Sequence, residues 1–411
     1  MVIYFVFLTI SAATYALFSL GLNLQWGVAG LINFGHVAFL AIGAYTTVLL
    51  SMPEGLTLPL QVIRALANGI YTNVAHIMPQ GLLQSLHLPA TLPPLELPSQ
   101  IATLAMPMPI AVLAGGALAA LLGLLIGIST LRLREDYLGI VTIGVSELVR
   151  LVARNEAWLT KGTFGVQGYP IPLDGREFNP TYPVKLLLIA WLTVICGLAL
   201  WRLFLWMRVK MSRLASGVIA SIFVLVVYIC GALSLYDYDS RAGLMLLTLT
   251  VLTIVYIGLE QVTNSPWGRI LKAIREDEEV AKALGKNVFW YKLQAFMLGG
   301  AIAGIAGAFY AWQFEVFPDD FKPLITFDAW IIVMLGGSGN HLGTIVGAVI
   351  FWSYYELTRT DAAKAMFRML HLDDTQQLGF RMIIVGLILM LLMVLRPQGI
   401  LGKKEELTLG R

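Results

Sequence analysis

The sequence predicts an all-α, polytopic membrane protein with about ten spanning segments, one of them broken or re-entrant. Of its 411 residues, 58% are hydrophobic and only 13% are charged. An ordinary soluble domain carries about 25% charged residues, so this chain lacks the polar surface that a water-soluble globule of its size needs. Its apolar residues also gather in long runs, and its basic residues gather between certain of those runs.

The apolar runs place the spans along the chain. A spanning helix needs roughly 20 mostly apolar residues, and most of the predicted spans reach or approach that length. Two are weaker, namely Leu138–Val152 and an interrupted pair, Ala329–Leu335 with Leu342–Tyr355. The stronger runs are Val2–Leu24, Leu31–Leu50, Met106–Leu131, Val184–Leu203, Leu214–Leu235, Gly243–Val262, Leu293–Ala311 and Met382–Leu395.

The basic residues orient these spans within a single transmembrane domain, 1–411. With ten crossings and the C-terminus inside, the inside segments hold more than half of the 28 Lys and Arg residues. Basic residues are retained on the cytoplasmic side, so the N-terminus is predicted to lie outside. The inside segments are Leu131–Tyr137, Arg202–Arg213, 264–292 and Arg396–Arg411.

The longest outside stretch, 51–104, has few charges and several prolines near its end. It could form an amphipathic helix at the membrane face or an irregular insert. We interpret it as a surface lid without chemistry of its own.

The largest inside segment, 264–292, has the pattern of two short amphipathic helices outside the bilayer. Pro266 is typical of a helix start, and Gly285 is typical of a helix end. Apolar residues between them recur at near-helical spacing. The residues alone leave two interpretations open, a solvated basic connector or an attachment point for another chain.

Four polar residues, Asn23, Gln25, Asn33 and His36, lie in the first two predicted spans or between them. Polar groups at membrane depth are unfavourable unless they are paired, so each is a functional candidate. Neighbouring glycines permit an unwound turn or a close backbone approach. These residues either line a translocation path near a helix break or hold helices together by hydrogen bonds.

The interrupted pair of apolar runs predicts a broken or re-entrant helix. About seven apolar residues cannot cross a bilayer at 1.5 Å per residue. Non-helical backbone at membrane depth is tolerated where it is buried in protein or lines an aqueous cavity. We therefore predict a helix break or gate at the glycines of this segment, which are Gly336, Gly337, Gly339 and Gly343.

Several kinds of site are not indicated. The stretch nearest to a P-loop, Leu335–Gly343, lacks the lysine that reaches the phosphates, so no nucleotide site is predicted. The two cysteines, Cys196 and Cys230, lack the spacing of a metal or redox motif. The five histidines are scattered, and the net charge of +3 is too small and dispersed for nucleic-acid binding. We predict no catalytic residue and no metal site.

Four blocks of the sequence carry a family resemblance: Gly21–Tyr45, Leu131–Arg150, Ser265–Phe296 and Leu335–Gly347. With their flanking spans they cover well over half of the chain. They resemble the LivM-type permeases of branched-chain amino-acid ABC importers. The first two blocks, together with Phe164–Pro170, look most similar to the cyanobacterial neutral amino-acid members of that family.

The resemblance implies a multi-pass subunit of a bacterial inner membrane, with a periplasmic N-terminus and a cytoplasmic C-terminus. It implies as partners a second, related permease, ABC ATPase subunits, a periplasmic substrate-binding protein and membrane lipid. ATP and magnesium would be bound by the ATPase, with no cofactor on this chain. Relative to the family, 51–104 is a long periplasmic insert and 184–235 looks like an extra helical hairpin.

The resemblance also favours the attachment interpretation of 264–292. ABC importer permeases dock on the ATPase through a cytoplasmic helix with the signature E-A-A-x-x-x-G. This chain reads Glu279-Val-Ala-Lys-Ala-Leu-Gly285, which keeps the acid, the second alanine and the glycine but has Val280 in place of the first alanine. The implied ATPase-coupling residues are Arg275, Glu279, Ala281 and Gly285.

Two alternative functions remain open. Related permeases carry urea or short amides, so the substrate could belong to that class. An ion-coupled secondary transporter would need paired intramembrane acids or an inverted repeat. The clearest acid within a span, Glu147, has Arg150 beside it on the same helix face, which favours a local ion pair instead.

Overall fold

The computed structural model describes residues 2–51, 108–131, 135–175, 180–207, 214–359, 374–395 and 399–402. Apart from Ser51, the predicted 51–104 insert lies outside the described residues. The described residues are predominantly helical, and one isolated antiparallel bridge joins Val166 to Val316. The all-α prediction is therefore confirmed.

The helices follow the predicted apolar runs closely. The first helix, α1 (Val2–Asn23), continues into a π-helical turn, η1 (Leu24–Val28). The others, in chain order, are α2 (Val37–Ser51), α5 (Met108–Thr130), α6 (Glu135–Asn155), α7 (Ala157–Thr160), η2 (Gly162–Phe164), α8 (Tyr182–Met207), α9 (Leu214–Asp237), α10 (Ala242–Asn264), α11 (Pro266–Glu276), α12 (Glu278–Ala283), α13 (Val288–Gln313), η4 (Pro318–Asp320), α14 (Leu324–Gly336), α15 (His341–Leu357) and α17 (Asp374–Leu395).

Among the described residues, fewer helices are long and apolar enough to cross a membrane than there are predicted apolar runs. Six of the described helices are long and apolar enough to span a membrane, or seven if the bent pair of α14 and α15 counts as one span. Helix α2 has only 15 residues, which at 1.5 Å per residue cover about 22 Å of a hydrocarbon core roughly 30 Å thick. Ten crossings is therefore an approximate count.

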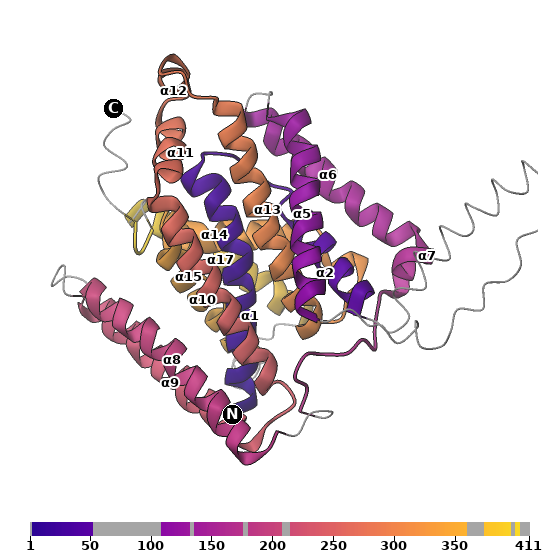
Figure 1. Cartoon of the computed structure of the whole chain (residues 1–411), viewed down its shortest axis with the longest axis vertical. Coiled ribbons are helices and arrows are strands. Elements are labelled where there is room, and N and C mark those ends of the chain that lie inside the picture. Colours follow the sequence, from indigo (N-terminus) through magenta and orange to yellow (C-terminus); the bar gives the residue numbers. More distant parts are fainter. Residues whose placement is uncertain are drawn as a thin grey trace, which may run out of the picture.

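Helices α1 and α13 form the centre of the bundle (Figure 1). Their most apolar windows are 72% and 78% buried inside the protein, whereas those of α8 and α9 are only 17% and 22% buried. In a bilayer the exposed apolar side chains of the peripheral helices face lipid rather than water. The central helices have to pair any polar group that they carry within the protein.

Small residues set the close packing around α13. A Cβ on Gly43 of α2 would overlap the carbonyl group of Gly304, and a Cβ on Gly304 would lie 2.5 Å from the Cβ of Ala119 on α5. Gly300, one turn before Gly304, belongs to the same packing face, since the aromatic ring of Phe39 lies against it. Small residues let helix backbones approach closely, which is how membrane helices gain van der Waals contact.

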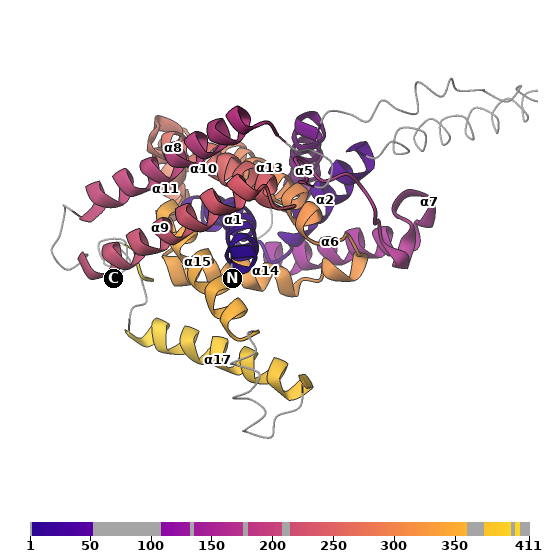
Figure 2. The ribbon, with the colours of Figure 1, turned by 90° about the horizontal axis from the view of Figure 1, so that it is seen from below.

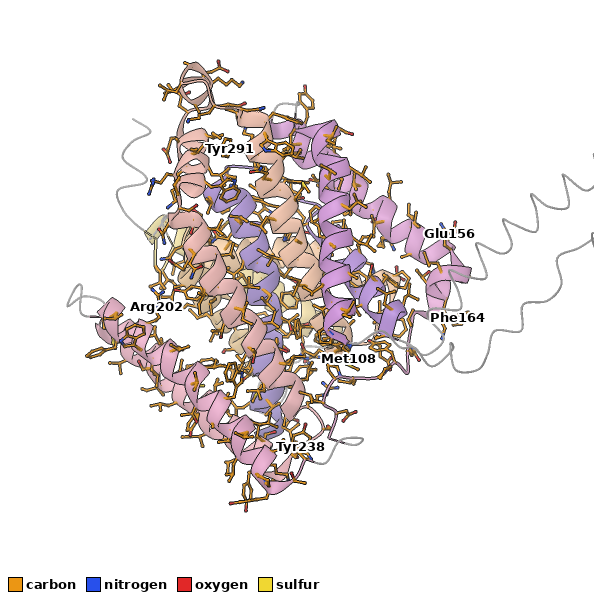
Figure 3. All side chains as sticks on the ribbon, viewed as in Figure 1. Met108, Glu156, Phe164, Arg202, Tyr238 and Tyr291 are labelled. Atoms are coloured by element: carbon orange, nitrogen blue, oxygen red, sulfur yellow. The ribbon has the colours of Figure 1, made fainter. Side chains whose placement is uncertain are left out.

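Helices α8 and α9 form an antiparallel hairpin along one side of the bundle, as Figures 1 and 2 both show. The hairpin packs on α1 and α10, and Trp191 of α8 donates a hydrogen bond of 3.0 Å to Thr250 of α10. In Figure 3, Arg202 near the end of α8 and Tyr238 just after α9 lie at opposite ends of this hairpin. The predicted pair of helices within 184–235 is present in the structure.

Candidate functional site

The first helix break lies at the end of α1, where η1 leads into an irregular connection. Gly30 has a φ of +75°, and helix resumes only at Val37. Asn33 and His36 therefore lie in the connection and not in a span. The amide side chain of Asn33 accepts a hydrogen bond of 3.0 Å from the Gly35 N–H, and such local bonds compete with helix formation.

Three of the four polar candidates form one hydrogen-bonded network. Gln25 donates to the carbonyl oxygen of Phe296 on α13 at 2.9 Å, and Asn33 donates to Gln25 at 2.8 Å. His36 Nε2 lies 3.1 Å from the carbonyl oxygen of Phe18. A carbonyl oxygen only accepts hydrogen bonds, so this contact requires the proton on Nε2, and Nδ1 can then accept from the Asn33 amide at 3.4 Å. All three side chains are buried. The network joins the break to α1 and α13.

The fourth, Asn23, reaches the second helix break. Its side-chain oxygen accepts a hydrogen bond of 2.8 Å from the Gly339 N–H, and its nitrogen lies 3.2 Å from Nδ1 of His341. His341 Nε2 lies 3.2 Å from the hydroxyl of Thr263, at the end of α10. A Cβ on Gly27 would overlap the backbone nitrogen of Gly339. The path and gate candidates, more than 300 residues apart in sequence, are therefore in direct contact.

The second break is the turn between α14 and α15, and it confirms the predicted broken helix. The two helices are bent by 117°, and Gly337 and Gly339 have φ values of +110° and +77°, which side chains with a Cβ rarely adopt. Gly336 and Gly343 face each other so closely that a Cβ on Gly343 would lie 2.5 Å from the Gly336 oxygen. All four predicted glycines lie in or beside the turn.

A segment near the C-terminus, 399–402, covers the end of α14. The backbone N–H groups of Ile400 and Leu401 donate to the carbonyl oxygens of Leu335 and Gly336, each at 3.0 Å. Asn340 donates from its side chain to the Leu401 oxygen at 2.9 Å. These bonds satisfy carbonyls that a helix end leaves without intrahelical partners. Sequence reasoning missed this contact, because hydrogen bonds made by the backbone of four residues leave no periodic pattern of side chains.

The segment 264–292 folds as the predicted pair of short helices, at the end of the molecule opposite the N-terminus (Figure 1). Helix α11 begins at Pro266. Helix α12 is capped by Asp277, whose side chain accepts from the N–H groups of Glu279 and Val280 at 2.9 and 3.0 Å. Gly285 ends it with a φ of +73°, the left-handed conformation that glycine adopts without strain.

Helix α12 has one face packed on the protein and one face exposed. Ala281 is buried in a small cluster with Ile274 and Val288, beside which Tyr291 packs (Figure 3). The side chain of Glu279 is 87% exposed, and Val280 and Leu284 are exposed as well. Two apolar side chains and an acid thus form an outward surface, which we call the α12 face.

An ion pair ties α12 to the central helix. Glu278 bonds Lys292 of α13 at 2.5 Å and Lys282 at 3.1 Å. Partial burial raises the pKa of the Glu278 carboxyl, but its bonds to Lys292 and Lys282 outweigh that effect and hold the pKa below its usual value. Glu278 therefore stays ionised at neutral pH and keeps α12 attached to α13.

Arg275 points into this chain and not along the α12 face. Its guanidinium Nη1 donates to the carbonyl oxygen of Gly27 in η1, and its Nη2 pairs with Glu276 at 2.8 Å. A Cβ on Gly30 would lie 3.0 Å from the Arg275 side chain. Of the four predicted coupling residues, Glu279 lies on the outer surface, Ala281 packs inward, Gly285 ends the helix and Arg275 contacts the first helix break.

Among the residues that the structure describes, no group of three or more His, Cys, Asp or Glu side chains could hold a metal ion.

Arg150 of α6 bonds Glu147 and also reaches Asp319 of η4 at 2.7 Å. The predicted local pair at Glu147 is thus confirmed, and it also joins α6 to the link before α14.

The model of one permease family, described as the branched-chain amino acid transport system permease component, matches residues 4–393. The chain belongs to that family. Both helix breaks and the α11–α12 segment fall within the matched range.

Individual relatives of this chain are also permeases. It is 29% identical over 392 residues to the high-affinity branched-chain amino acid transport system permease protein LivM of Escherichia coli, covering 94% of this chain and 67% of that protein. It is 22% identical over 297 residues to a probable LivM of Methanocaldococcus jannaschii, covering 71% and 68%. A shorter match, 28% over 133 residues, covers 31% of this chain and 37% of the autoinducer 2 import permease LsrC of an Enterobacter strain. No solved structure matches significantly.

Replacing Asn23 is expected to destabilise the permease. Asn23→Leu leaves the partly buried Gly339 N–H without its acceptor, which costs up to about 1–3 kcal/mol. Asn23→Asp keeps that acceptor but puts a carboxyl group at a fully buried position, where its ionised form is unfavourable, so it should also lower the unfolding midpoint at neutral pH. Thermal unfolding of the detergent-purified protein measures both, and a midpoint for Asn23→Leu equal to wild type would contradict the structural role of this bond.

Proposed function

We propose that this chain is the membrane-spanning permease subunit of an ABC importer that carries branched-chain or other neutral amino acids. The family match over residues 4–393 carries the proposal. The Escherichia coli and Methanocaldococcus jannaschii relatives are named as branched-chain amino acid transport permeases, which supplies the substrate class. The exposed α12 face supplies a surface on which an ATPase could act.

The proposal assigns the energy source and the substrate selectivity to other chains. ABC ATPase subunits, holding ATP and magnesium, bind the α12 face through Glu279, Val280 and Leu284. A second, related permease completes the membrane part, and a periplasmic binding protein delivers the amino acid. The complex lies in a bacterial inner membrane, with the N-terminus of this chain periplasmic and its C-terminus cytoplasmic.

The proposed mechanism is alternating access at the two helix breaks. In the structure Asn23, Gln25, Asn33 and His36 are buried and bonded to one another, to backbone carbonyls or to the second break. A path along these residues would open when ATP binding separates the breaks, which exposes amide and imidazole groups to the passing zwitterion. The turn at 337–340 acts as the gate, because Gly337 and Gly339 add no side-chain bulk there.

The test is to recover a tagged copy of this chain from its native membranes in mild detergent and to identify the proteins bound to it. An ABC ATPase and a second permease are expected. In proteoliposomes, that complex and its binding protein should accumulate radiolabelled leucine when ATP is supplied. Accumulation of leucine against its gradient by this chain alone, without any nucleotide hydrolase, would overturn the proposal.

A further inference from the structure

The cytoplasmic segment touches the first helix break through one long side chain. Arg275 lies in the last turn of α11 and donates to the carbonyl oxygen of Gly27, within η1. Its aliphatic part lies beneath Gly30, where the chain leaves the break. The side chain is only 21% exposed. A charge-assisted hydrogen bond in such partly buried surroundings is stronger than one between neutral groups.

The Gly27 carbonyl lies in η1, where the regular α-helical hydrogen-bond pattern is already interrupted. A π-helical turn contains one residue more than an α-helical turn, and such turns often occur at functional sites. The same Gly27 lies against the backbone of Gly339 in the second break, and Asn23 of α1 bonds the Gly339 N–H at 2.8 Å. The close glycine packing and the Asn23 bond join the two breaks, so a displacement of the first break is transmitted to the second.

We propose that Arg275 is a positioning residue that transmits movement of α11 and α12 to the two joined helix breaks. The inference rests on the proposed function, because it takes α12 to be the element that the ATPase moves. Glu278 and Lys292 fix α12 to α13, while Arg275 fixes α11 to η1. A displacement of α11 therefore pulls on Gly27, and through Gly27 on the turn at Gly339.

The geometry separates this role from attachment of the ATPase. On the same helix Arg269 is exposed and reaches only as far as the Asn264 carbonyl, at 3.4 Å. Arg269 and Arg275 thus carry the same charge on one helix, one directed outward and one into the break. Loss of Arg275 should leave the α12 face intact and break the link behind it.

The experiment compares Arg275→Gln with Arg269→Gln in the complex isolated from native membranes and reconstituted in proteoliposomes. Bound ATPase, ATP hydrolysis and uptake of radiolabelled leucine are measured for each. Arg275→Gln should keep its ATPase and its hydrolysis, while leucine taken up per ATP falls by about fivefold or more, the range of a typical coupling between sites. Arg269→Gln should match wild type in all three.

Two outcomes would overturn the inference. One is an uptake per ATP for Arg275→Gln that equals the value for Arg269→Gln. The other is loss of the ATPase from Arg275→Gln, which would make Arg275 a docking residue. If Arg275→Gln does not assemble, Arg275→Met decides: it keeps a long aliphatic side chain but donates no hydrogen bond to Gly27, so its uptake per ATP should fall with the ATPase still bound, and an unchanged ratio counts against the role. A wild-type complex without ATP-driven leucine uptake would instead refute the proposed function.

Discussion

Glu279→Lys is expected to detach the ATPase from the permease while leaving the permease folded. The side chain of Glu279 is 87% exposed, and its contact within this chain is to Lys282 at 3.3 Å. An exposed ion pair contributes about 0–1 kcal/mol to stability, so reversing the charge changes the fold little. Against a partner surface shaped for an acid, the reversed charge costs several kcal/mol, which corresponds to a loss of bound ATPase of about tenfold or more.

The matched control is Glu156→Lys, the same charge reversal at an exposed site. Glu156 lies between α6 and α7, far from α12 and from Tyr291 (Figure 3). The amount of ATPase that co-purifies with each variant is measured against the amount of the permease. Equal recovery of the ATPase with Glu279→Lys and Glu156→Lys would contradict docking at the α12 face. Reduced insertion of Glu279→Lys would instead contradict its surface position.

Gly43→Ala is expected to destabilise the helix bundle strongly. The added methyl group would overlap the backbone of Gly304, where α2 crosses α13. A backbone neighbour cannot rotate out of the way as a side chain can. Overpacking of this kind typically costs about 1–3 kcal/mol and occasionally more. The measurements are the thermal unfolding midpoint of the detergent-purified protein and its yield in the membrane.

Gly258→Ala is the matched control for this substitution. Gly258 lies within α10, and a Cβ there meets no atom within 4 Å. Alanine is favoured over glycine inside a helix by about 0.5–1 kcal/mol, so this variant should be as stable as wild type or more stable. A midpoint for Gly43→Ala that equals the midpoint for Gly258→Ala would show that α2 and α13 do not pack as described.

The sequence predicted the helices well because each depends on local information. A run of apolar residues specifies a helix wherever the surroundings are lipid, so α5, α8, α9, α10 and α13 all lie on predicted runs. Pro266 and Gly285 likewise mark the limits of the α11–α12 segment. The second predicted span began too early, at Leu31 instead of Val37, because apolar residues in the connection extend the run without being helical.

Contacts between distant residues could not be predicted in this way. Asn23 and Gly339 were assigned to separate groups, a path and a gate, and only the folded chain joins them. The family resemblance implies that Arg275 and Glu279 are both coupling residues, yet the two side chains point to different places. Residues four apart share a face within one helix, but the extended Asp277 separates α11 from α12, so Arg275 and Glu279 belong to different helices.

The sequence by itself determined that this protein is helical, lies in a membrane, has a broken helix near 337–340 and carries a short helical segment at 264–292. These features follow from composition and from local hydrogen bonding, which each segment satisfies alone. Only the tertiary structure decided that the two helix breaks touch, that Arg275 reaches the first of them and that residues 399–402 cover the second. Such pairings depend on backbone groups that every sequence has, so no residue pattern shows which groups will meet.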